Sequence, residues 1–370
     1  MTTAVAPAPL SSLFSPGLEF GMQDETGGTT NVFFVETQQW EQQALVELCS
    51  RHCKVHADHR PIQDIPDGDL PGDVEIFSPF IQSRVDGRQL DRLGPHLRLI
   101  STRSTGYDHI DMAECDARGI IIANVPVYGE TSVAEHCFAI LLALTRKVCR
   151  AAERTARGDF SIEGLRGADL HGKVFGAIGA GAIARRTLRM AGGFGMRRLA
   201  YDIHPDADVA GETGFEYVDF DDLLARSDVI SLHVPYNRHT HHMIDAEALH
   251  RCKPGVIIVN TARGALIDTP ALIDALRSGQ VGGAALDVIE GEEIIGEEAQ
   301  LLGGGHDIEA LRRLLQSQTL LRMPNVIITP HIAFNSEQSV RRIIETTIQN
   351  IRSFIEGEPA HVVHIPLARA

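Results

Sequence analysis

The segment that most constrains the fold runs from Val174 to Asp202 and reads VFGAIGAGAIARRTLRMAGGFGMRRLAYD. It predicts a buried strand, a glycine turn, a helix and a second strand, which together form a dinucleotide-binding βαβ unit. Gly179 and Gly181 bring bare backbone N–H groups to the start of the helix, where the helix dipole favours a pyrophosphate. Ala184 stands at the third glycine position, and its methyl group still permits close packing of helix on strand. We therefore expect a cofactor site.

Asp202 indicates which dinucleotide the unit prefers. It ends the second predicted strand, about twenty residues after the glycines, as in dinucleotide-binding units. A carboxylate at this place accepts hydrogen bonds from the ribose hydroxyls and would repel a 2′-phosphate. The segment therefore favours NAD over NADP. An ordinary glycine-rich βα turn is the alternative, and the flanking strands together with the spaced acid argue against it.

Length and apolar content predict a folded protein with two domains. The chain has 370 residues, a length too great for one compact core. Of these residues 44% are hydrophobic, as in a folded protein. Residues 1–30 are rich in Pro, Ser, Thr and Gly and contain no Lys or Arg, so we expect a disordered tail and no secretory signal. The apolar stretch Cys137–Leu144 is far shorter than the roughly 20 residues of a membrane helix. We expect a cytoplasmic protein without a membrane partner.

Charge and cysteine content exclude further classes. The formal net charge is −15 and no basic stripe offsets it, so nucleic acid is not expected as a partner. The six cysteines are scattered, as is typical of a reducing compartment. One group of possible zinc ligands lies close together in sequence: Cys49, His52, Cys53, His56 and His59. A helix followed by a strand would scatter these side chains, and we expect no metal.

Two alternations of strands and helices predict two α/β layers. Between Asn31 and Ile122, the apolar runs NVFFV, CKVHA, VEIFS, LRLIST and GIIIAN alternate with helical patterns such as Trp40–His52 and Arg88–Leu93. From Gly172 to Pro330, six further strands are predicted: VFGAIG, RLAYDI, VISLHVP, VIIVNT, GGAALDV and NVIITP. Helices between them complete a doubly wound nucleotide-binding domain.

Three other segments connect or extend these layers. The stretch after Pro126, TSVAEHCFAILLALTRKVCRAAERTARG, predicts one long connecting helix with Thr131 or Ser132 as its N-cap. Ser336–Glu356 predicts an amphipathic helix that returns to the first domain and leaves a cleft between two lobes. Glu290–Leu321 is polar and long for a connection, which indicates either a surface excursion or part of an oligomer contact.

Polar residues follow four of the later strands at their carboxyl ends, where a doubly wound sheet places its ligands. They are HVP at His233–Pro235, NTARG at Asn260–Gly264, LDVIEGEE at Leu286–Glu293 and TPHIAF at Thr329–Phe334. Hydride transfer to a 2-oxo acid needs a cation for the carboxylate, a donor to the ketone oxygen and a proton source. These segments contain candidates for all three.

Arg263, Glu292 and His331 are the candidate catalytic residues. The planar guanidinium of Arg263 can hold carboxylate and carbonyl oxygens together. His331 would protonate the alkoxide, and Glu292 on the far ring nitrogen would favour the imidazolium and fix the ring. The structural alternatives are a surface histidine, one of 17 in the chain, a helix-capping arginine and a solvated acid.

The motifs together resemble one family. STRSTGYDHID at Ser101–Asp111 and VPVYGETSVAEH at Val125–His136 precede the glycine turn, HVP, NTARGALID, LDVIEGEE and TPHIAF. In this order they resemble the D-isomer-specific 2-hydroxyacid dehydrogenase family, and most of all its D-lactate dehydrogenase-like branch, from about Asn31 to the C-terminus. The resemblance implies an NAD-dependent enzyme that interconverts a 2-oxo acid and a D-2-hydroxy acid.

The resemblance also implies residue roles. Arg263 would bind substrate, and Glu292 and His331 would form the acid/base pair. Cofactor contacts would come from Gly179, Gly181, Ala182, Ile183, Asp202, His233, Val234, Pro235, Thr240, Thr261, Ala262, Arg263, Asp287 and His331. The substrate site would include Thr105, Gly106, Tyr107, Tyr128, Arg263 and Phe334, where ordinary aromatic packing is the alternative for the aromatic residues.

We therefore expect an α/β protein of two lobes, each a parallel sheet flanked by helices. A flavodoxin-like substrate domain would comprise residues 31–127 and 332–370, and a Rossmann NAD domain residues 128–331. The family commonly forms homodimers through the long helix region, to which the apolar run Cys137–Leu144 belongs, although core packing also explains that run.

Other functions stay open on this scaffold. Formate dehydrogenases of the superfamily carry glutamine in place of Glu292, and phosphoglycerate dehydrogenases often add a regulatory domain, so neither is favoured. Phosphite oxidation uses a similar arginine and histidine. An NAD(H)-sensing protein like the transcriptional corepressors that resemble these dehydrogenases is a further alternative, because such proteins can keep the same three residues.

Overall fold

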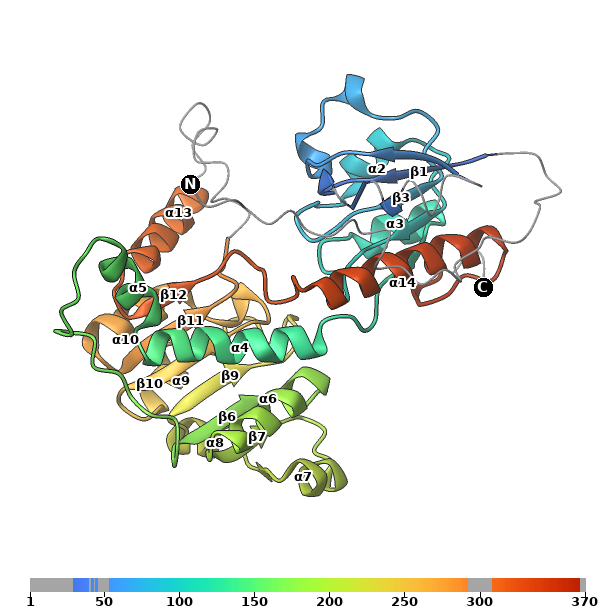
Figure 1. Ribbon diagram of the computed structural model, residues 1–370. Coiled ribbons are helices and arrows are strands. Elements are labelled where there is room, and N and C mark those ends of the chain that lie inside the picture. Colours follow the sequence, from blue (N-terminus) through green and yellow to red (C-terminus); the bar gives the residue numbers. More distant parts are fainter. Residues whose placement is uncertain (1–28, 40, 43, 46–52, 292–307, 367–370) are drawn as a thin grey trace. The chain divides into compact units, whose positions relative to one another are not determined.

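The computed structural model describes residues 29–39, 41–42, 44–45, 53–291 and 308–366 (Figure 1). The tail expected over residues 1–30 falls outside the described residues as far as residue 28, as does most of the predicted helix Trp40–His52. The chain divides into two compact units. Unit 1 comprises Met1–Tyr128 with Glu337–Ala370, and unit 2 comprises Gly129–Ser336.

Unit 1 is built on a six-stranded sheet in the order β13-β5-β4-β3-β1-β2. Its strands are β1 (Thr30–Phe34), β2 (Cys53–Ala57), β3 (Ile76–Ser78), β4 (Leu99–Ser101), β5 (Ile121–Ala123) and β13 (Val362–His364). The five parallel strands are those predicted from the sequence, and their order is the flavodoxin-like one. The edge strand β13, which pairs antiparallel with β5, was not predicted.

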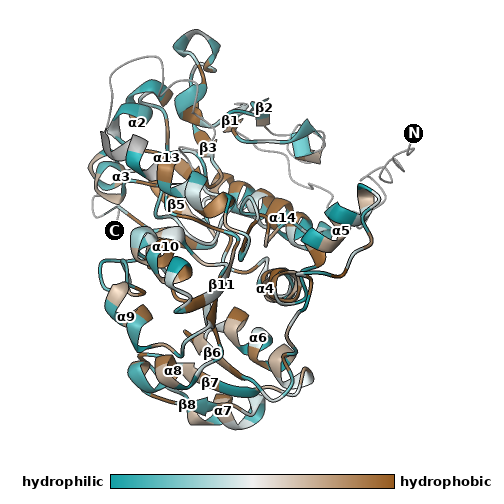
Figure 2. Cartoon of the chain, turned by 90° about the vertical axis from the view of Figure 1, so that its left-hand side faces the viewer, coloured by the Kyte–Doolittle hydropathy of each residue, from teal (hydrophilic) through white to brown (hydrophobic). Residues whose placement is uncertain are grey.

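Helices cover the sheet of unit 1. They are α2 (Gly87–Leu93), α3 (Met112–Arg118) and α14 (Glu337–Ile355), with 3₁₀ turns at Ile62–Asp64 and Asp67–Asp69. The carboxylate of Asp111 caps α3 by accepting hydrogen bonds from two backbone N–H groups, and Gly119 ends that helix in the left-handed conformation. In Figure 2, hydrophobic segments recur along α14, which packs against β4. The predicted helix Ser336–Glu356 is thus confirmed in type, with bounds one residue shorter at each end.

Unit 2 contains a seven-stranded parallel sheet in the order β12-β11-β10-β9-β6-β7-β8. Its strands are β6 (Val174–Ile178), β7 (Arg197–Tyr201), β8 (Glu216–Tyr217), β9 (Val229–Leu232), β10 (Val256–Asn260), β11 (Val281–Leu286) and β12 (Val326–Ile328). The chain first adds β7 and β8 on one side of β6 and then β9 to β12 on the other. This reversal is the point where doubly wound sheets bind ligands at the carboxyl ends of their strands. The six predicted strands are confirmed, and β8 is an additional edge strand.

Both faces of this sheet are covered by helices. They are α4 (Glu130–Thr145), α5 (Val148–Ala156), α6 (Ala182–Gly193), α7 (Ala207–Thr213), α8 (Phe220–Arg226), α9 (Ala246–Arg251), α10 (Thr269–Ser278) and α13 (Ile308–Leu321), with a 3₁₀ turn at Gly264–Leu266. Alternate strand residues enter two core clusters: Ile258 packs with residues of α8, α9 and α10, and Val259 packs with residues of α4 and α6. Burial on both faces explains why these strands read as continuous apolar runs.

The prediction of a single long helix after Pro126 is wrong. α4 ends at Thr145 and α5 begins at Val148, because Lys147 adopts a left-handed backbone with φ of 57°. The carbonyl of Thr145 accepts a hydrogen bond from the N–H of Ala168, which stands in for continuation of the helix. The N-cap is Gly129, not Thr131 or Ser132. Because glycine has no side chain, no side-chain hydrogen bond caps this helix.

Among the described residues, no helix combines the length and the apolar character that a membrane span requires.

The core of unit 2 yields a test of its packing. Ile258 lies in β10 with none of its surface exposed, whereas Ile203 is 75% exposed. We expect Ile258→Ala to lower the free energy of unfolding by about 2–5 kcal/mol, because the substitution leaves a cavity between sheet and helices. Ile203→Ala should change it by less than about 0.5 kcal/mol. Urea unfolding of both variants measures the difference, and equal effects would contradict this packing.

Candidate active site

The glycine turn after β6 has the geometry of a phosphate-binding loop. Gly179 has φ of 96°, and a Cβ atom there would lie 2.8 Å from the carbonyl oxygen of His233, so only glycine fits. Gly181 is the N-cap of α6, and a Cβ atom there would meet nothing within 4 Å. Open space thus lies at the N-terminus of α6, whose first residues are Ala182 and Ile183, where the helix favours an anion.

Asp202 ties the end of β7 to this turn. Its Oδ2 accepts a hydrogen bond from the N–H of Ala180 at 2.7 Å, and its Oδ1 accepts one from the N–H of His204 at 2.9 Å. A carboxylate has about four acceptor sites, so capacity for ribose hydroxyls remains. Ala184, at the third glycine position, is fully buried in the cluster between helix and sheet.

The end of β9 carries a neutral histidine. Burial lowers the pKa of His233 to about 4, and its Nε2 lies 2.9 Å from Oγ of Ser231. The loop that follows, with Val234 and Pro235, is fixed by Thr240, whose hydroxyl donates to the carbonyl of Pro235 at 2.8 Å. These four predicted cofactor residues therefore belong to one ordered strand end and loop.

The loop after β10 is shaped by Asn260. Its Oδ1 accepts from the N–H of Ala262 at 3.0 Å and its Nδ2 donates to the carbonyl of Arg263 at 2.8 Å. Arg263 is half-buried, and its Nη1 donates to the carbonyl of Ala262 at 2.8 Å. The hydroxyl of Thr261 is buried without a hydrogen-bond partner among the described residues. Such an orphaned group fits a site that is completed by a bound molecule.

Asp287, at the end of β11, is the centre of a buried network. Its Oδ1 accepts from the hydroxyl of Thr329 at 2.5 Å and from the N–H of Ile332 at 3.0 Å, and its Oδ2 accepts from the N–H of Ala333 at 2.8 Å. Nε2 of His136, on α4, lies 3.3 Å from Oδ1. Burial alone would raise the pKa of Asp287, but the hydrogen bonds from His136, Thr329 and the two N–H groups outweigh it and lower the pKa.

The same network holds His331 in an unusual backbone conformation. His331 has φ of 53°, a left-handed conformation that residues other than glycine rarely adopt. Its N–H donates to the carbonyl oxygens of Asp287 and Thr329, each at 2.9 Å. Backbone outliers of this kind cost about 1–3 kcal/mol and cluster at functional sites. Arg263 and His331 thus follow β10 and β12 at the same edge of one parallel sheet.

The structure places the other predicted residues as follows. In unit 1, the hydroxyl of Thr105 donates to the carbonyl of Val125 at 2.8 Å, and the turn continues through Gly106 to Tyr107, which is 38% exposed. The carbonyl of Tyr128 accepts hydrogen bonds from the Ser339 hydroxyl and from Arg342, both in unit 1. Phe334 is half-buried in unit 2, and Glu292 lies outside the described residues.

The resemblance implies that Asp287 contacts the cofactor, but the structure surrounds its side chain with protein. Its side chain is enclosed by protein donors and is 1% exposed, so its evident task is to hold the turn around His331. Sequence reasoning gave no role to His136 or Thr329, although both stand in the quoted motifs. It also missed Glu290, whose carboxylate pairs with His242, because a pair 48 residues apart leaves no local pattern.

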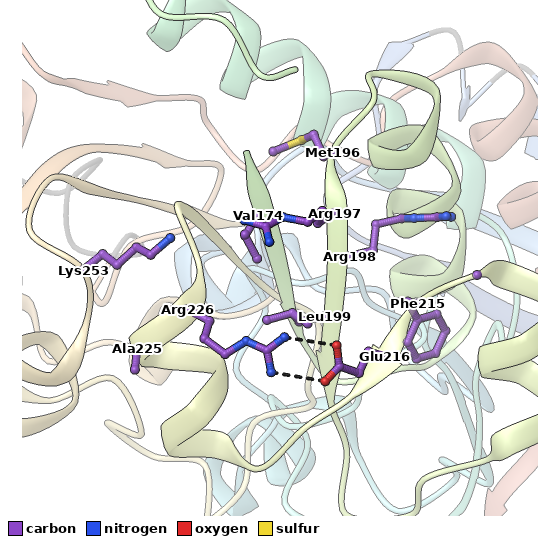
Figure 3. Close-up of a pocket in the computed structure, with 11 residues that line it drawn as sticks. Val174, Met196, Arg197, Arg198, Leu199, Phe215, Glu216, Ala225, Arg226 and Lys253 are labelled. Atoms are coloured by element: carbon purple, nitrogen blue, oxygen red, sulfur yellow. Dashed lines mark hydrogen bonds and ion pairs between the residues drawn. The ribbon is translucent and has the colours of Figure 1, made fainter. Parts of the chain in front are cut away.

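A pocket of about 650 Å³ opens at the opposite edge of the sheet in unit 2 (Figure 3). It lies at the amino ends of β6 and β7, near the end of α8. Three of its four cations have partners within the protein: Arg226 contacts Glu216 at 3.0 Å, Lys253 contacts Asp228 at 3.2 Å, and Arg198 donates to the carbonyl of Thr213 at 2.5 Å. We therefore place the candidate active site at the carboxyl edge and not in this pocket. Within the described ranges, no group of three or more His, Cys, Asp or Glu side chains could hold a metal ion.

The fold and this edge define the class of protein: a two-unit α/β protein whose second unit is a Rossmann domain suited to NAD. Residues 138–333 match the family described as "D-isomer specific 2-hydroxyacid dehydrogenase, NAD binding domain". The chain belongs to this family and is most similar to its D-lactate dehydrogenase-like branch. It is accordingly an NAD-dependent oxidoreductase of 2-hydroxy acids.

Individual relatives agree with this placement. The chain is 34% identical to 2-hydroxyacid dehydrogenase homolog 1 of Schizosaccharomyces pombe, over 90% of this chain and 99% of that protein. It is 38% identical to D-lactate dehydrogenase of Escherichia coli, over 73% and 80% of the two chains. The crystal structure of D-lactate dehydrogenase from Aquifex aeolicus complexed with NAD and lactic acid matches with a TM-score of 0.79 and 36% identity, covering 89% of this chain and 96% of that one.

The buried Asp287 network yields a test by pH. Because its pKa is lowered in the folded state, the ionised carboxyl stabilises the fold above the unfolded-state pKa of about 3.9, and this stabilisation is lost as the pH falls further. We expect Asp287→Asn to lower the free energy of unfolding by about 3 kcal/mol at pH 7. The amide nitrogen of asparagine cannot accept a hydrogen bond, so at least one of the donors around this side chain loses its acceptor. Urea unfolding at pH 7 and pH 3.5 measures the difference in the free energy of unfolding between this variant and wild type, which we call the gap. A gap that stays constant or widens on acidification would contradict the lowered pKa.

Proposed function

We propose that the chain reduces a small 2-oxo acid to the D-2-hydroxy acid, and catalyses the reverse reaction, with pyruvate and D-lactate as the first pair to test. The observation that carries this proposal is the strained turn at His331, which lies at the same edge of the NAD domain as the Arg263 loop. Relatives named D-lactate dehydrogenase, and a neighbour structure that contains NAD and lactic acid, support the choice of substrate.

NAD(H) carries the hydride when bound. Gly179 and Gly181 would admit its phosphates at the N-terminus of α6, and Asp202 would accept the ribose hydroxyls and disfavour a 2′-phosphate. The unpartnered hydroxyl of Thr261 is available to a ligand atom at the same edge. His233, with its lowered pKa, stays neutral there at pH 7, so it adds no charge to the cofactor site.

We assign the chemistry to three side chains. The guanidinium of Arg263 binds the substrate carboxylate and polarises the carbonyl oxygen, because a net charge of −15 leaves anions dependent on a local cation. His331 donates a proton to the carbonyl oxygen during reduction and takes it back during oxidation. Glu292 supports the protonated imidazole. We assign further substrate contacts to the N–H groups of the Thr105–Gly106 turn, to Tyr107 and to Tyr128 in unit 1, and to Phe334 in unit 2.

We further propose a homodimer in the cytoplasm. The run Cys137–Leu144 does not support a dimer surface, because Cys137, Leu141 and Leu144 are buried in the core cluster of unit 2. Apolar side chains are exposed further along the chain instead: Phe160 is 78% and Ile162 is 86% exposed. Neighbouring exposed apolar residues favour contact with another protein surface, and a second copy is the simplest occupant.

The first functional test is turnover with a panel of 2-oxo acids. We expect NADH oxidation with pyruvate, phenylpyruvate, glyoxylate, hydroxypyruvate or 2-oxoisocaproate. Arg263→Gln should lower kcat/KM by about 10³-fold, because both substrate binding and carbonyl polarisation are lost. His331→Ala should mainly abolish kcat, and Glu292→Gln should shift the pH–rate profile of reduction to lower pH. Lys253→Gln, at the opposite edge, is the control.

Three outcomes would redirect the assignment. Silence across the panel with intact NADH binding would favour a sensing protein, and turnover with phosphite alone would favour phosphite oxidation. Wild-type kinetics in Arg263→Gln or His331→Ala would contradict the role of that residue.

The proposed dimer is tested at its exposed apolar residues. The double variant Phe160→Glu/Ile162→Glu should convert the dimer to a monomer, because two charges would be buried in the contact. Sedimentation equilibrium measures the mass, with Ile203→Glu as a control at another exposed apolar position. A wild-type monomer, or a dimer unaffected by the double variant, would contradict the proposed dimer contact.

A further inference from the structure

We propose that His242 and Glu290 form a clasp around the loop that carries Arg263, and that both are positioning residues for substrate binding. The inference rests on the proposed role of Arg263 and deepens it. We define the Arg263 loop as residues 260–266. It begins at the last residue of β10 and lies between the segment 242–244 on one side and the segment 289–290 on the other.

The first side of the clasp is a backbone pairing. The N–H of His242 donates to the carbonyl of Ala265 at 2.9 Å, and the N–H of Ile244 donates to the carbonyl of Leu266 at 3.1 Å. Ile244 and Ile267 form an isolated parallel bridge just beyond. The end of the Arg263 loop is therefore fixed to the segment that contains His242.

The second side is a close backbone contact. A Cβ atom on Gly264 would lie 2.1 Å from the carbonyl carbon and 2.4 Å from the carbonyl oxygen of Ile289, and 2.3 Å from the backbone nitrogen of Glu290. Backbone atoms cannot yield as a flexible side chain can, so only glycine permits this approach. The residue directly after Arg263 is thus pressed against the segment that follows β11.

A side-chain pair joins the two sides. Nε2 of His242 lies 3.1 and 3.2 Å from the two carboxylate oxygens of Glu290. The His242 side chain is 29% exposed and that of Glu290 is 22% exposed, so the pair is partly shielded from water. His242 has φ of 50°, a left-handed conformation that costs free energy and that the surrounding contacts maintain.

The surroundings of His242 leave its ring little freedom. Nδ1 lies 4.0 Å from Oδ2 of Asp268, the carboxylate that caps α10 by accepting from the N–H of Ala271. The ring of His241 stacks on that of His242 with centroids 3.9 Å apart. Because two acids and a stacked ring restrain the His242 imidazole, it keeps Glu290 at a constant position relative to the Arg263 loop.

A clasp that only stabilised the fold would affect all ligands alike, whereas a positioning role is specific to the carboxylate that Arg263 binds. We expect His242→Ala and Glu290→Ala each to raise KM for pyruvate and Ki for oxamate by roughly tenfold, since a small displacement of a binding group has a large effect. The Kd for NADH should change by less than about threefold, because only Thr261, Ala262 and Arg263 of its expected contacts lie in this loop, whereas the glycine turn and Asp202 lie elsewhere on the edge.

Conservative and double variants sharpen the test. His242→Gln should keep KM within about threefold of wild type, since its amide can still donate to Glu290. The double variant His242→Ala/Glu290→Ala should be no worse than either single variant, because both break the same contact. His250→Ala, an exposed histidine of α9, is the matched control. Glu290→Met, which removes the acceptor and keeps a side chain of similar length, replaces any alanine variant that fails to fold.

The outcomes separate the clasp from the proposed function. Wild-type pyruvate and oxamate constants in His242→Ala and Glu290→Ala, with Arg263→Gln impaired, would overturn the clasp alone. Additive effects in the double variant, or an equal loss of NADH affinity, would also overturn it. Wild-type kinetics in Arg263→Gln would instead overturn the proposed function.

Discussion

The candidate site depends on one buried carboxylate. Removing a carboxylate from water costs several kcal/mol unless it is fully paired, and Asp287 has four donors within hydrogen-bonding distance. Those donors come from α4, from Thr329 after β12 and from the turn that contains His331. Because the charge is stable only when all of them surround it, folding the core of unit 2 also fixes that turn. The position of His331 is in this way a consequence of satisfying Asp287.

Sheet topology then determines which residues can share a site. In a parallel sheet, the glycine turn after β6, His233 after β9, Arg263 after β10 and Asp287 after β11 all reach the same edge. Topology alone leaves each loop free to move. The close approach at Gly264 and the pair His242–Glu290 remove that freedom, and they do so through contacts between loops and not through strand geometry.

The sequence predicted the strands well because burial on both faces makes them continuous apolar runs, and the motifs follow these strands at their carboxyl ends, as expected. Short edge strands such as β8 and β13 carry no such pattern. The break at Lys147 was missed because it depends on a distant N–H, that of Ala168, capping the carbonyl of Thr145. The partners of Asp287 and Glu290 were missed for the same reason: each pair joins segments more than 40 residues apart.

Two residues at the candidate site show how local strain and function are linked. His331 and His242 both have positive φ, where glycine would be unstrained. Each strained backbone is held by hydrogen bonds to a neighbouring loop, so each depends on tertiary structure. Glycine at either position would relieve the strain and remove the imidazole. The presence of histidine at both therefore implies that the side chains contribute more than the strain costs. For His331 the proposed contribution is proton transfer, and for His242 it is the proposed restraint of the Arg263 loop through Glu290.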